Sequence, residues 1–275
     1  MQLDAYLARI GHQGPVAPDL ATLRALHRAH LLAIPYENID VQLGQAMTTN
    51  PAAAYARIVE QGGRGGWCYE MNGLFGWALG EIGFSVTRMA GGVVRELLGD
   101  GQVGNHLILK VDLEDGPWIA DVGFGDGPLE PYPLKPHAFV QEGYAYALEQ
   151  VEDGWWRLRN HPYGGARSFD FRDAPADEAV LSERCDFQHR NEASPFVLNL
   201  VCQRATPPAI AQLRSRTLRI VRPDGFDERI LASEADLAEV LQTTFGITGV
   251  DVPALWRKAE ARHAALFSDP GPPSP

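Results

Sequence analysis

Cys68 is the residue whose setting in this sequence best suits chemistry. It follows the segment 62–66, which contains four glycines, and it stands where an apolar helix running to Ile82 would begin. The exposed amides and the positive dipole end of such a helix favour a thiolate over a thiol, and glycines let a ligand approach the backbone closely. We therefore predict that Cys68 is a nucleophile, whereas Cys185 and Cys202 lack this setting and are predicted to be buried structural thiols.

A nucleophilic thiol needs a base, and the base needs an orienting group. His106 opens a predicted strand, and after a turn at Asp115 and Gly116 the apolar segment 118–125 is interrupted by Asp121, whose burial is costly without a partner. A hairpin centred on that turn puts Asp121 on the same face as His106 but four residues away, ~13 Å at ~3.3 Å per residue. Contact then requires a bulge or a different pairing, so spacing alone leaves this pair open.

The other histidines and cysteines do not form a metal-binding pattern. His27 and His30 share one predicted helix face, but no acidic or cysteine partner stands nearby in the sequence, which favours packing. The three cysteines are widely spread and contain no C-x-x-C pair, which argues against a disulfide framework and against zinc. We expect no metal, and the odd number of cysteines suits a reducing, cytoplasmic location.

Composition excludes several classes of protein. The chain has 275 residues, 45% of them hydrophobic, and its 24 Lys+Arg against 35 Asp+Glu give a net charge of −11. These values fit a folded globular protein, and so acidic a chain is not expected to bind nucleic acid or an anionic membrane. No apolar run approaches the ~18 residues of a membrane helix, and the first residues do not resemble a signal peptide.

Three segments must position these residues. Residues 1–83 show helical periodicity with caps at Asp19 and Asn50, and residues 84–190 read mainly as short antiparallel strands, with turns at 99–101, 114–117 and 152–154. Residues 191–275 mix both types, including a predicted strand over 196–203 and a tail from 269 that we expect to be disordered. No repeat or long linker is visible, so one shared body is expected.

Several motifs resemble those of the arylamine N-acetyltransferases. Residues 64–75 (RGGWCYEMNGLF) are similar to the active-site signature of that family, and residues 106–109 (HLIL) and 121–125 (DVGFG) resemble its histidine and aspartate motifs in the same order. Residues 34–40 (IPYENID) resemble a fourth motif and residues 194–196 (SPF) a weaker fifth. The resemblance thus extends from residue 34 to residue 196.

The resemblance implies a fold and a set of roles. The fold would be α+β, with an N-terminal helical bundle, a central antiparallel β-barrel, a C-terminal α/β lid and a cysteine-protease-like Cys-His-Asp core. Cys68 would accept the acyl group, His106 would be its base and Asp121 would orient the imidazole. The remaining implied residues are the structural ion pair Arg64 and Glu37, the acceptor-pocket walls Phe124, Tyr36 and Tyr69, and the CoA contacts Gly125, Gly127 and Asn105.

The implied reaction is a ping-pong transfer of acetyl from acetyl-CoA, through a thioester on Cys68, to an arylamine, a hydrazine or an N-hydroxyarylamine, a reaction of xenobiotic metabolism. One departure from the family pattern is Asp126, which would repel a phosphate unless it faces solvent or CoA lies differently. The alternatives are a macrolactam-forming amide synthase of an ansamycin-type polyketide pathway, which takes its acyl chain from a carrier protein, a cysteine hydrolase and an inactive binding module.

Overall fold

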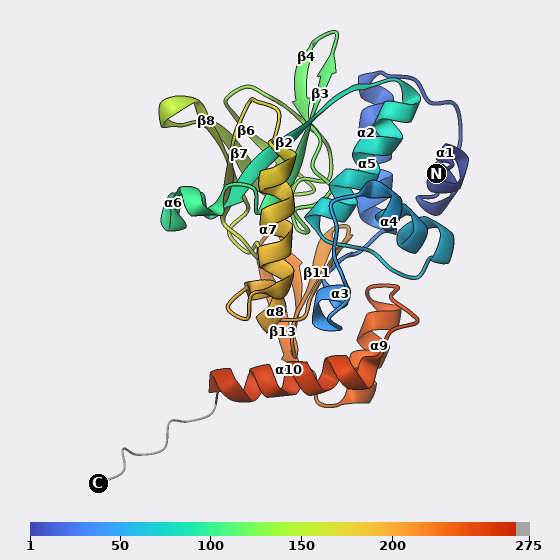
Figure 1. Ribbon diagram of the computed structural model, residues 1–275, viewed down its shortest axis with the longest axis vertical. Helices are drawn as coiled ribbons and strands as arrows, with labels where there is room; N and C mark the ends of the chain where they lie inside the picture. Colours follow the sequence, from blue (N-terminus) through green and yellow to red (C-terminus); the bar gives the residue numbers. More distant parts are fainter. Residues whose placement is uncertain (268–275) are drawn as a thin grey trace.

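The computed structural model describes residues 1–267, so the tail from residue 269, for which we predict disorder, lies outside the described residues. Helices make up most of the N-terminal third, as predicted (Figure 1). Their bounds are α1 Leu3–Arg9, α2 Leu20–Ala33, α3 Ile39–Gln42, α4 Pro51–Tyr55, the π-helical turn Ala56–Gln61 and α5 Cys68–Ile82.

The ends of these helices follow from the capping residues in the sequence. The Asp19 side chain accepts a hydrogen bond from the Thr22 amide at 2.8 Å, and the Asn50 side chain accepts one from the Ala52 amide at 2.9 Å. Gly83 ends α5 with a φ of 104°, a left-handed conformation that glycine adopts without steric cost. The apolar faces of these helices then pack with Leu109 of the central sheet in one core.

The central sheet has eight strands and is antiparallel throughout (Figure 1). In spatial order the strands are β5 Tyr132–Pro133, β4 Gly116–Ile119, β3 His106–Leu113, β2 Ser85–Val93, β9 Ser168–Arg172, β8 Trp155–Arg159, β7 Tyr144–Gln150 and β6 His137–Gln141. Since β5 and β6 are its edges, the predicted barrel is, within residues 1–267, a half-barrel and not a closed ring of strands. The α+β class is confirmed.

The β3–β4 hairpin differs from the prediction in its register. Leu113 pairs with Gly116, so the turn consists of Glu114 and Asp115 and is centred one residue earlier than expected. The ladder continues until the Ala120 amide donates to the Leu109 carbonyl. One further step brings Asp121 opposite Ile108, two positions from His106 on the same face, where diagonal neighbours come within reach.

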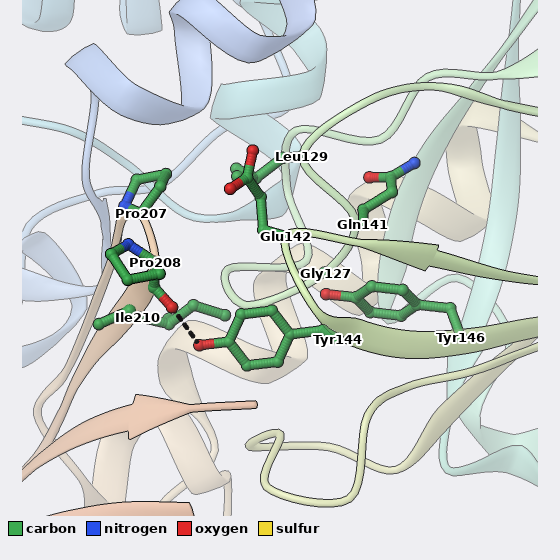
Figure 2. A pocket seen from close by; sticks show the side chains of 10 residues that line it. Gly127, Leu129, Gln141, Glu142, Tyr144, Tyr146, Pro207, Pro208 and Ile210 are labelled. Carbon is green, nitrogen blue, oxygen red and sulfur yellow. Dashed lines mark hydrogen bonds between the residues drawn. The ribbon is translucent and has the colours of Figure 1, made fainter. Parts of the chain in front are cut away.

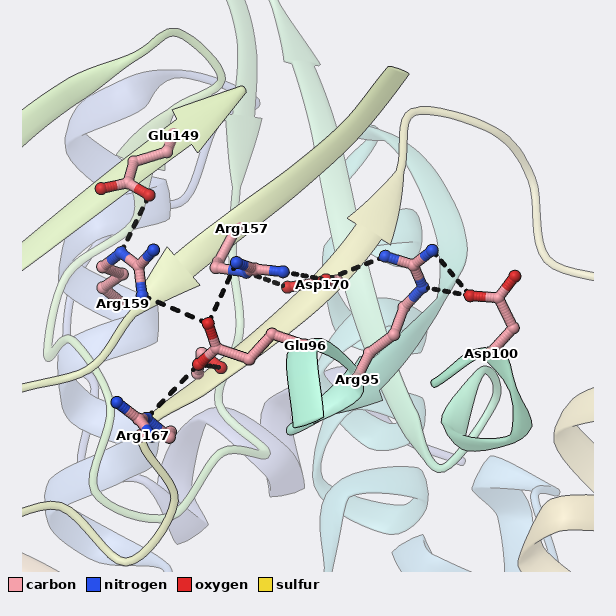
Figure 3. Close-up of polar contacts among 9 residues, drawn as sticks. Arg95, Glu96, Asp100, Glu149, Arg157, Arg159, Arg167 and Asp170 are labelled. Carbon is pink, nitrogen blue, oxygen red and sulfur yellow. Dashed lines mark hydrogen bonds and ion pairs between the residues drawn. The ribbon is translucent and has the colours of Figure 1, made fainter. Parts of the chain in front are cut away.

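The connection between β2 and β3 is also longer than the predicted turn at 99–101. It contains the short helix α6 Arg95–Leu98 and a 3-10 turn over Asp100–Gln102. Ion pairs fix this connection to the sheet: the fully buried Asp170 of β9 accepts from Arg95 at 3.0 Å and from Arg157 of β8 at 2.7 Å (Figure 3). The same network therefore holds β9 in place against α6.

A second sheet contains strands from both the N-terminal and the C-terminal third of the chain. Its order is β1 Tyr36–Glu37, β10 Val201–Thr206, β11 Ala209–Arg214, β12 Thr217–Arg222 and β13 Gly225–Ile230. The helices α9 Glu234–Thr243 and α10 Val252–Phe267 complete this region. Because β1 belongs to the N-terminal third and pairs with β10, the N-terminal and C-terminal segments share one sheet.

Helices α7 Glu178–Arg190 and α8 Pro195–Leu198 connect the two sheets (Figure 1). The strand predicted over 196–203 is wrong in its first half. The Ser194 side chain caps the Phe196 amide and Pro195 takes the first helical position, which together start a helix. Over the described chain, no helix combines the length and the hydropathy needed to span a membrane.

Candidate active site

Helix α5 positions the cysteine. Cys68 is its first residue, and only 2% of the residue is exposed. The Glu70 carboxylate accepts from the Trp67 amide at 3.3 Å, which fixes the backbone directly before the thiol. Asn72 stands one turn further along α5, so its side chain shares a helix face with Cys68.

The structure brings His106 and Asp121 into contact. His106 Nε2 lies 2.7 Å from Asp121 Oδ2, and both residues are buried. This bond uses Nε2, which leaves Nδ1 as the ring nitrogen available to the thiol. The revised hairpin register accounts for the contact, and the chain leaves the ladder after Ala120, so that the Asp121 carboxylate reaches the imidazole.

Asn72 connects the elements that carry the candidate residues, and it was not among the predicted site residues. Its Nδ2 donates to the Leu107 carbonyl at 2.6 Å and to Asp121 Oδ1 at 2.7 Å, and its Oδ1 accepts from the Val122 amide at 2.9 Å. Gly123 permits this close approach, since a Cβ there would lie 2.7 Å from Cys68 Cα. The signal available in the sequence was an asparagine one helical turn after the predicted nucleophile.

The electrostatics of the pair favour a charged imidazole. Burial lowers the pKa of His106, but the charge and hydrogen bond of Asp121, and then the hydrogen bond with Cys68, outweigh it and raise that pKa to about 10. Burial raises the pKa of Asp121, but His106 and the hydrogen bonds from Asn72 and Gly123 lower it overall. At neutral pH an imidazolium therefore faces a carboxylate beside the thiol.

Arg64 and Glu37, expected to form an ion pair, are in contact next to the start of α5. Arg64 Nε lies 2.9 Å from Glu37 Oε1, and Arg64 Nη2 lies 2.8 Å from Asp40 Oδ1. Arg57 contacts the other oxygen of Asp40 and reaches Glu70 at 2.6 Å. These charges are largely or fully buried and paired with one another, and they connect the 34–40 segment to the first turn of the helix.

Aromatic rings surround the imidazole. The rings of Phe124 and His106 lie 5.6 Å apart, and Phe169, which was not predicted, lies 5.0 Å from His106 and 4.8 Å from Phe124. Phe169 is fully buried, and it directly precedes Asp170, which ion pairs from Arg95 and Arg157 hold in place (Figure 3). Tyr36 of β1 packs in the same apolar cluster as Cys68. The site thus has a predominantly apolar, aromatic wall.

Tyr69 and Asn105 are occupied by contacts within the protein. Tyr69 is fully buried, and its hydroxyl donates to the Gly104 carbonyl at 2.7 Å. Asn105 Oδ1 accepts from the Val93 amide at 2.8 Å, and Nδ2 donates to Gln102 at 2.9 Å, so its side chain is used to hold the β2–β3 connection. The Asn105 carbonyl lies 3.8 Å from Cys68 Sγ.

The loop after Asp121 lies between the two sheets. Gly125 has a φ of 82°, and a Cβ there would lie 1.9 Å from Gln203 Oε1 of β10. Asp126 does not face solvent: only 3% of it is exposed, and it accepts from Asn160 at 3.0 Å and from Gln212 of β11 at 2.8 Å. Burial outweighs these hydrogen bonds and raises the pKa of Asp126 to about 6.

A pocket near this loop is separate from the triad residues. It lies between β7 and the β10–β11 turn and is lined by Gly127, Tyr144, Tyr146 and neighbouring residues (Figure 2). The Tyr144 hydroxyl closes one side by donating to the Pro208 carbonyl at 3.2 Å. Gly127 is the predicted CoA contact that lines it, and Cys68, His106 and Asp121 do not.

The residues predicted to be structural lie in the core. His27 and His30 are buried, with His30 Nδ1 at 2.8 Å from the Tyr6 hydroxyl, and Cys185 and Cys202 are buried free thiols. No group of three or more side chains suited to holding a metal ion occurs among residues 1–267.

The side chains of Cys68, His106 and Asp121 give the site a thiol, an imidazole and a carboxylate. Such a set is able to move an acyl group through a thioester to an amine or to water.

Comparisons with known proteins give these observations a context. A family model described as N-acetyltransferase matches residues 19–252. An arylamine N-acetyltransferase from Mycolicibacterium smegmatis is 32% identical over 284 residues, covering 97% of this chain and 98% of that protein. An arylamine N-acetyltransferase / N-hydroxyarylamine O-acetyltransferase from Salmonella typhimurium is 38% identical over 164 residues, 58% of each chain. The structure of the Mycobacterium marinum arylamine N-acetyltransferase in complex with CoA has a TM-score of 0.82 at 29% identity, covering 95% of this chain and 98% of that one.

Proposed function

This chain belongs to the arylamine N-acetyltransferase family and transfers acetyl groups from acetyl-CoA to arylamines, and we propose that it does so through a thioester on Cys68. The observation that carries this mechanism is the 2.7 Å hydrogen bond between His106 and Asp121 beside a buried cysteine at a helix start. Asp121 holds the imidazole so that Nδ1 can exchange a proton with the thiol.

The first half of the proposed reaction loads the enzyme. In the reactive form the thiol proton lies on His106, which is then the imidazolium, and the Cys68 thiolate attacks the carbonyl carbon of acetyl-CoA to form a tetrahedral intermediate. The bond to the CoA sulfur then breaks, and the departing thiolate receives the proton from the His106 imidazolium. A buried site of this kind limits competing hydrolysis, because little water reaches the thioester.

The second half passes the acetyl group to the acceptor. The amine nitrogen attacks the carbonyl of acetyl-Cys68, His106 accepts the proton that the nitrogen loses, and the Cys68 thiolate leaves. The aromatic rings of Phe124 and Phe169 around His106 support an aryl acceptor, because flat rings pack edge to face against one another. We extend the acceptors to hydrazines, and to N-hydroxyarylamines, which the Salmonella relative's name includes.

The second sheet acts as a lid in this proposal. Gln212 of β11 binds Asp126, and Gly125 lies against Gln203 of β10, so this sheet packs on the loop that follows Asp121. Gly125 and Gly127 remain the proposed CoA contacts. The inward-facing Asp126 removes the objection that its charge would meet the CoA phosphates, because its oxygens are taken up by protein donors. A reducing, cytoplasmic location would keep Cys68 as a free thiol.

Initial-rate kinetics test the order of the two halves. Acetyl-CoA and an arylamine such as aniline are varied together, and the double-reciprocal plots are expected to be parallel, because CoA leaves before the amine binds. Intersecting lines would contradict the thioester route. Release of CoA without any amine, at the full turnover rate, would instead favour the hydrolase, and loading only from an acyl carrier protein would favour the amide synthase.

A further inference from the structure

Helix α7 places one polar side chain against the backbone that comes directly before His106. Leu181, Cys185 and Gln188 follow one another at helical spacing and form the buried face of α7. Leu181 and Cys185 pack in the same apolar cluster as Cys68. Gln188, with 6% exposure, is the polar member of this face.

Gln188 makes two contacts, both through its amide nitrogen. Nε2 donates to the Asn105 carbonyl at 2.8 Å and to the Tyr69 hydroxyl at 3.1 Å. The Tyr69 hydroxyl in turn donates to the Gly104 carbonyl at 2.7 Å. Gln188 and Tyr69 together therefore hold the two backbone carbonyls that come directly before His106.

The Asn105 carbonyl also lies 3.8 Å from Cys68 Sγ, in position to accept the thiol proton. A carbonyl so placed opposes the thiolate, since its negative end points at the sulfur, and it competes with His106 for the proton. An N–H donor is stronger than S–H, so the bond from Gln188 reduces the pull of this oxygen on the thiol. It also fixes how close the oxygen can come.

We propose that Gln188 is a positioning residue for acyl transfer: it holds the 104–105 backbone and its carbonyl so that the Cys68 proton goes to His106. This proposal rests on the proposed role of Cys68 as nucleophile. Gln188 acts through Asn105 and Tyr69, and its contribution is to the reactivity of the thiol.

The test compares Gln188→Met, which keeps the length of the side chain and removes both donors, with Gln42→Met as a matched control. Gln42 is equally buried and donates through Nε2 to the Phe196 and Val197 carbonyls of α8. Both variants therefore lose two hydrogen bonds that a buried amide nitrogen donates, but only Gln188 binds the carbonyl at Sγ. Melting temperature and circular dichroism establish that each is folded.

The readout is the rate at which iodoacetamide alkylates Cys68, followed by peptide mapping across pH 5 to 10. Gln188→Met should be alkylated about 3- to 10-fold more slowly at pH 7, the effect of one net hydrogen bond, with the curve moved to higher pH. Gln42→Met should match the wild type. The rate of Cys68 acetylation should fall by a similar factor, whereas kcat/KM for the amine, which reports the second half-reaction, should not change.

A folded Gln188→Met variant with wild-type alkylation at every pH would overturn the proposal, as would an equal loss in Gln42→Met. If Gln188→Met does not fold, Gln188→Glu decides, since its carboxylate has the same shape and cannot donate to Asn105; wild-type alkylation there would also overturn it. Alkylation does not involve acetyl-CoA. Wild-type protein that acetyl-CoA fails to acetylate would therefore refute the proposed function separately from this comparison.

Discussion

Asp121→Asn should block the reaction by reversing the tautomer of His106. Asp121 Oδ1 accepts two hydrogen bonds, from Asn72 and from the Gly123 amide, while Oδ2 accepts from His106 Nε2. The amide oxygen of the variant must therefore take the place of Oδ1, and its NH2 group faces Nε2. An NH2 donor requires an unprotonated Nε2, which puts the ring proton on Nδ1, where the imidazole can no longer accept a proton from Cys68.

The size of the effect follows from the charge that Asp121 stabilises. A His106 pKa of about 10 against the ordinary 6.5 corresponds to about 5 kcal/mol of preference for the imidazolium. Asp121 is the main source of that preference, so its loss should slow acetylation of Cys68 roughly 10³- to 10⁴-fold, as in Ser-His-Asp triads. The contribution of the His106 charge to the free energy of unfolding is complete below pH 6.5 and is lost as the pH rises through about 10. The wild type should therefore lose stability between these pH values, and Asp121→Asn should not.

Single-turnover acetylation, followed by the mass of the intact protein, measures the rate. Asp112→Asn is the matched control, because Asp112 lies on the same strand as His106 but is exposed. Melting temperatures show whether each variant is folded. A folded Asp121→Asn protein that is acetylated within about tenfold of the wild-type rate would refute the tautomer argument.

Three further substitutions test other parts of the structure. Cys68→Ser should keep the melting temperature and lose transfer, because a hydroxyl is a far weaker nucleophile; full activity in steady-state assays would exclude the covalent route. Glu37→Gln should lower the free energy of unfolding by about 3 kcal/mol, since it leaves the buried Arg64 guanidinium with Asp40 as its remaining charged partner; a loss below about 1 kcal/mol in urea titrations would contradict this. Asp126→Asn should change the pH dependence of stability: the folded wild type takes up a proton near pH 6 while the unfolded chain stays ionised down to 3.8, so wild type should gain about 1 kcal/mol on the variant between pH 7 and pH 5. A difference that stays constant over this range would show that Asp126 does not titrate there.

Local signals in the sequence predicted the elements well where a cap or a period defines them. Asp19, Asn50 and Gly83 begin or end helices as expected, because each acts on its own few neighbours. The strand prediction for the first half of 196–203 was wrong because a short run of apolar residues fits a strand or a helix equally. The Ser194 cap and Pro195 decide for a short helix there. A one-residue error in the β3–β4 turn was enough to separate His106 from Asp121 by two further positions.

Contacts between distant segments could not be predicted in this way. Gln188 lies 83 residues from Asn105 and 119 from Tyr69, and nothing near it in the sequence indicates that it binds these two residues beside the nucleophile. In the sequence, Phe169 looks like any other apolar strand residue. Only the fold shows that its ring lies 5.0 Å from that of His106. Asp126 was expected to face solvent or to lie away from the CoA phosphates, whereas packing of the second sheet on its loop buries it.

The central claim is that the acetyl group passes through Cys68, and the mass of the intact protein tests it most directly. Purified enzyme is mixed with acetyl-CoA in the absence of amine, the protein is weighed and digested, and an arylamine is then added. The account predicts a gain of one acetyl group, located on Cys68, which disappears on addition of the amine as the N-acetylated product forms. An enzyme that turns over acetyl-CoA and amine while Cys68 is never acetylated would contradict it.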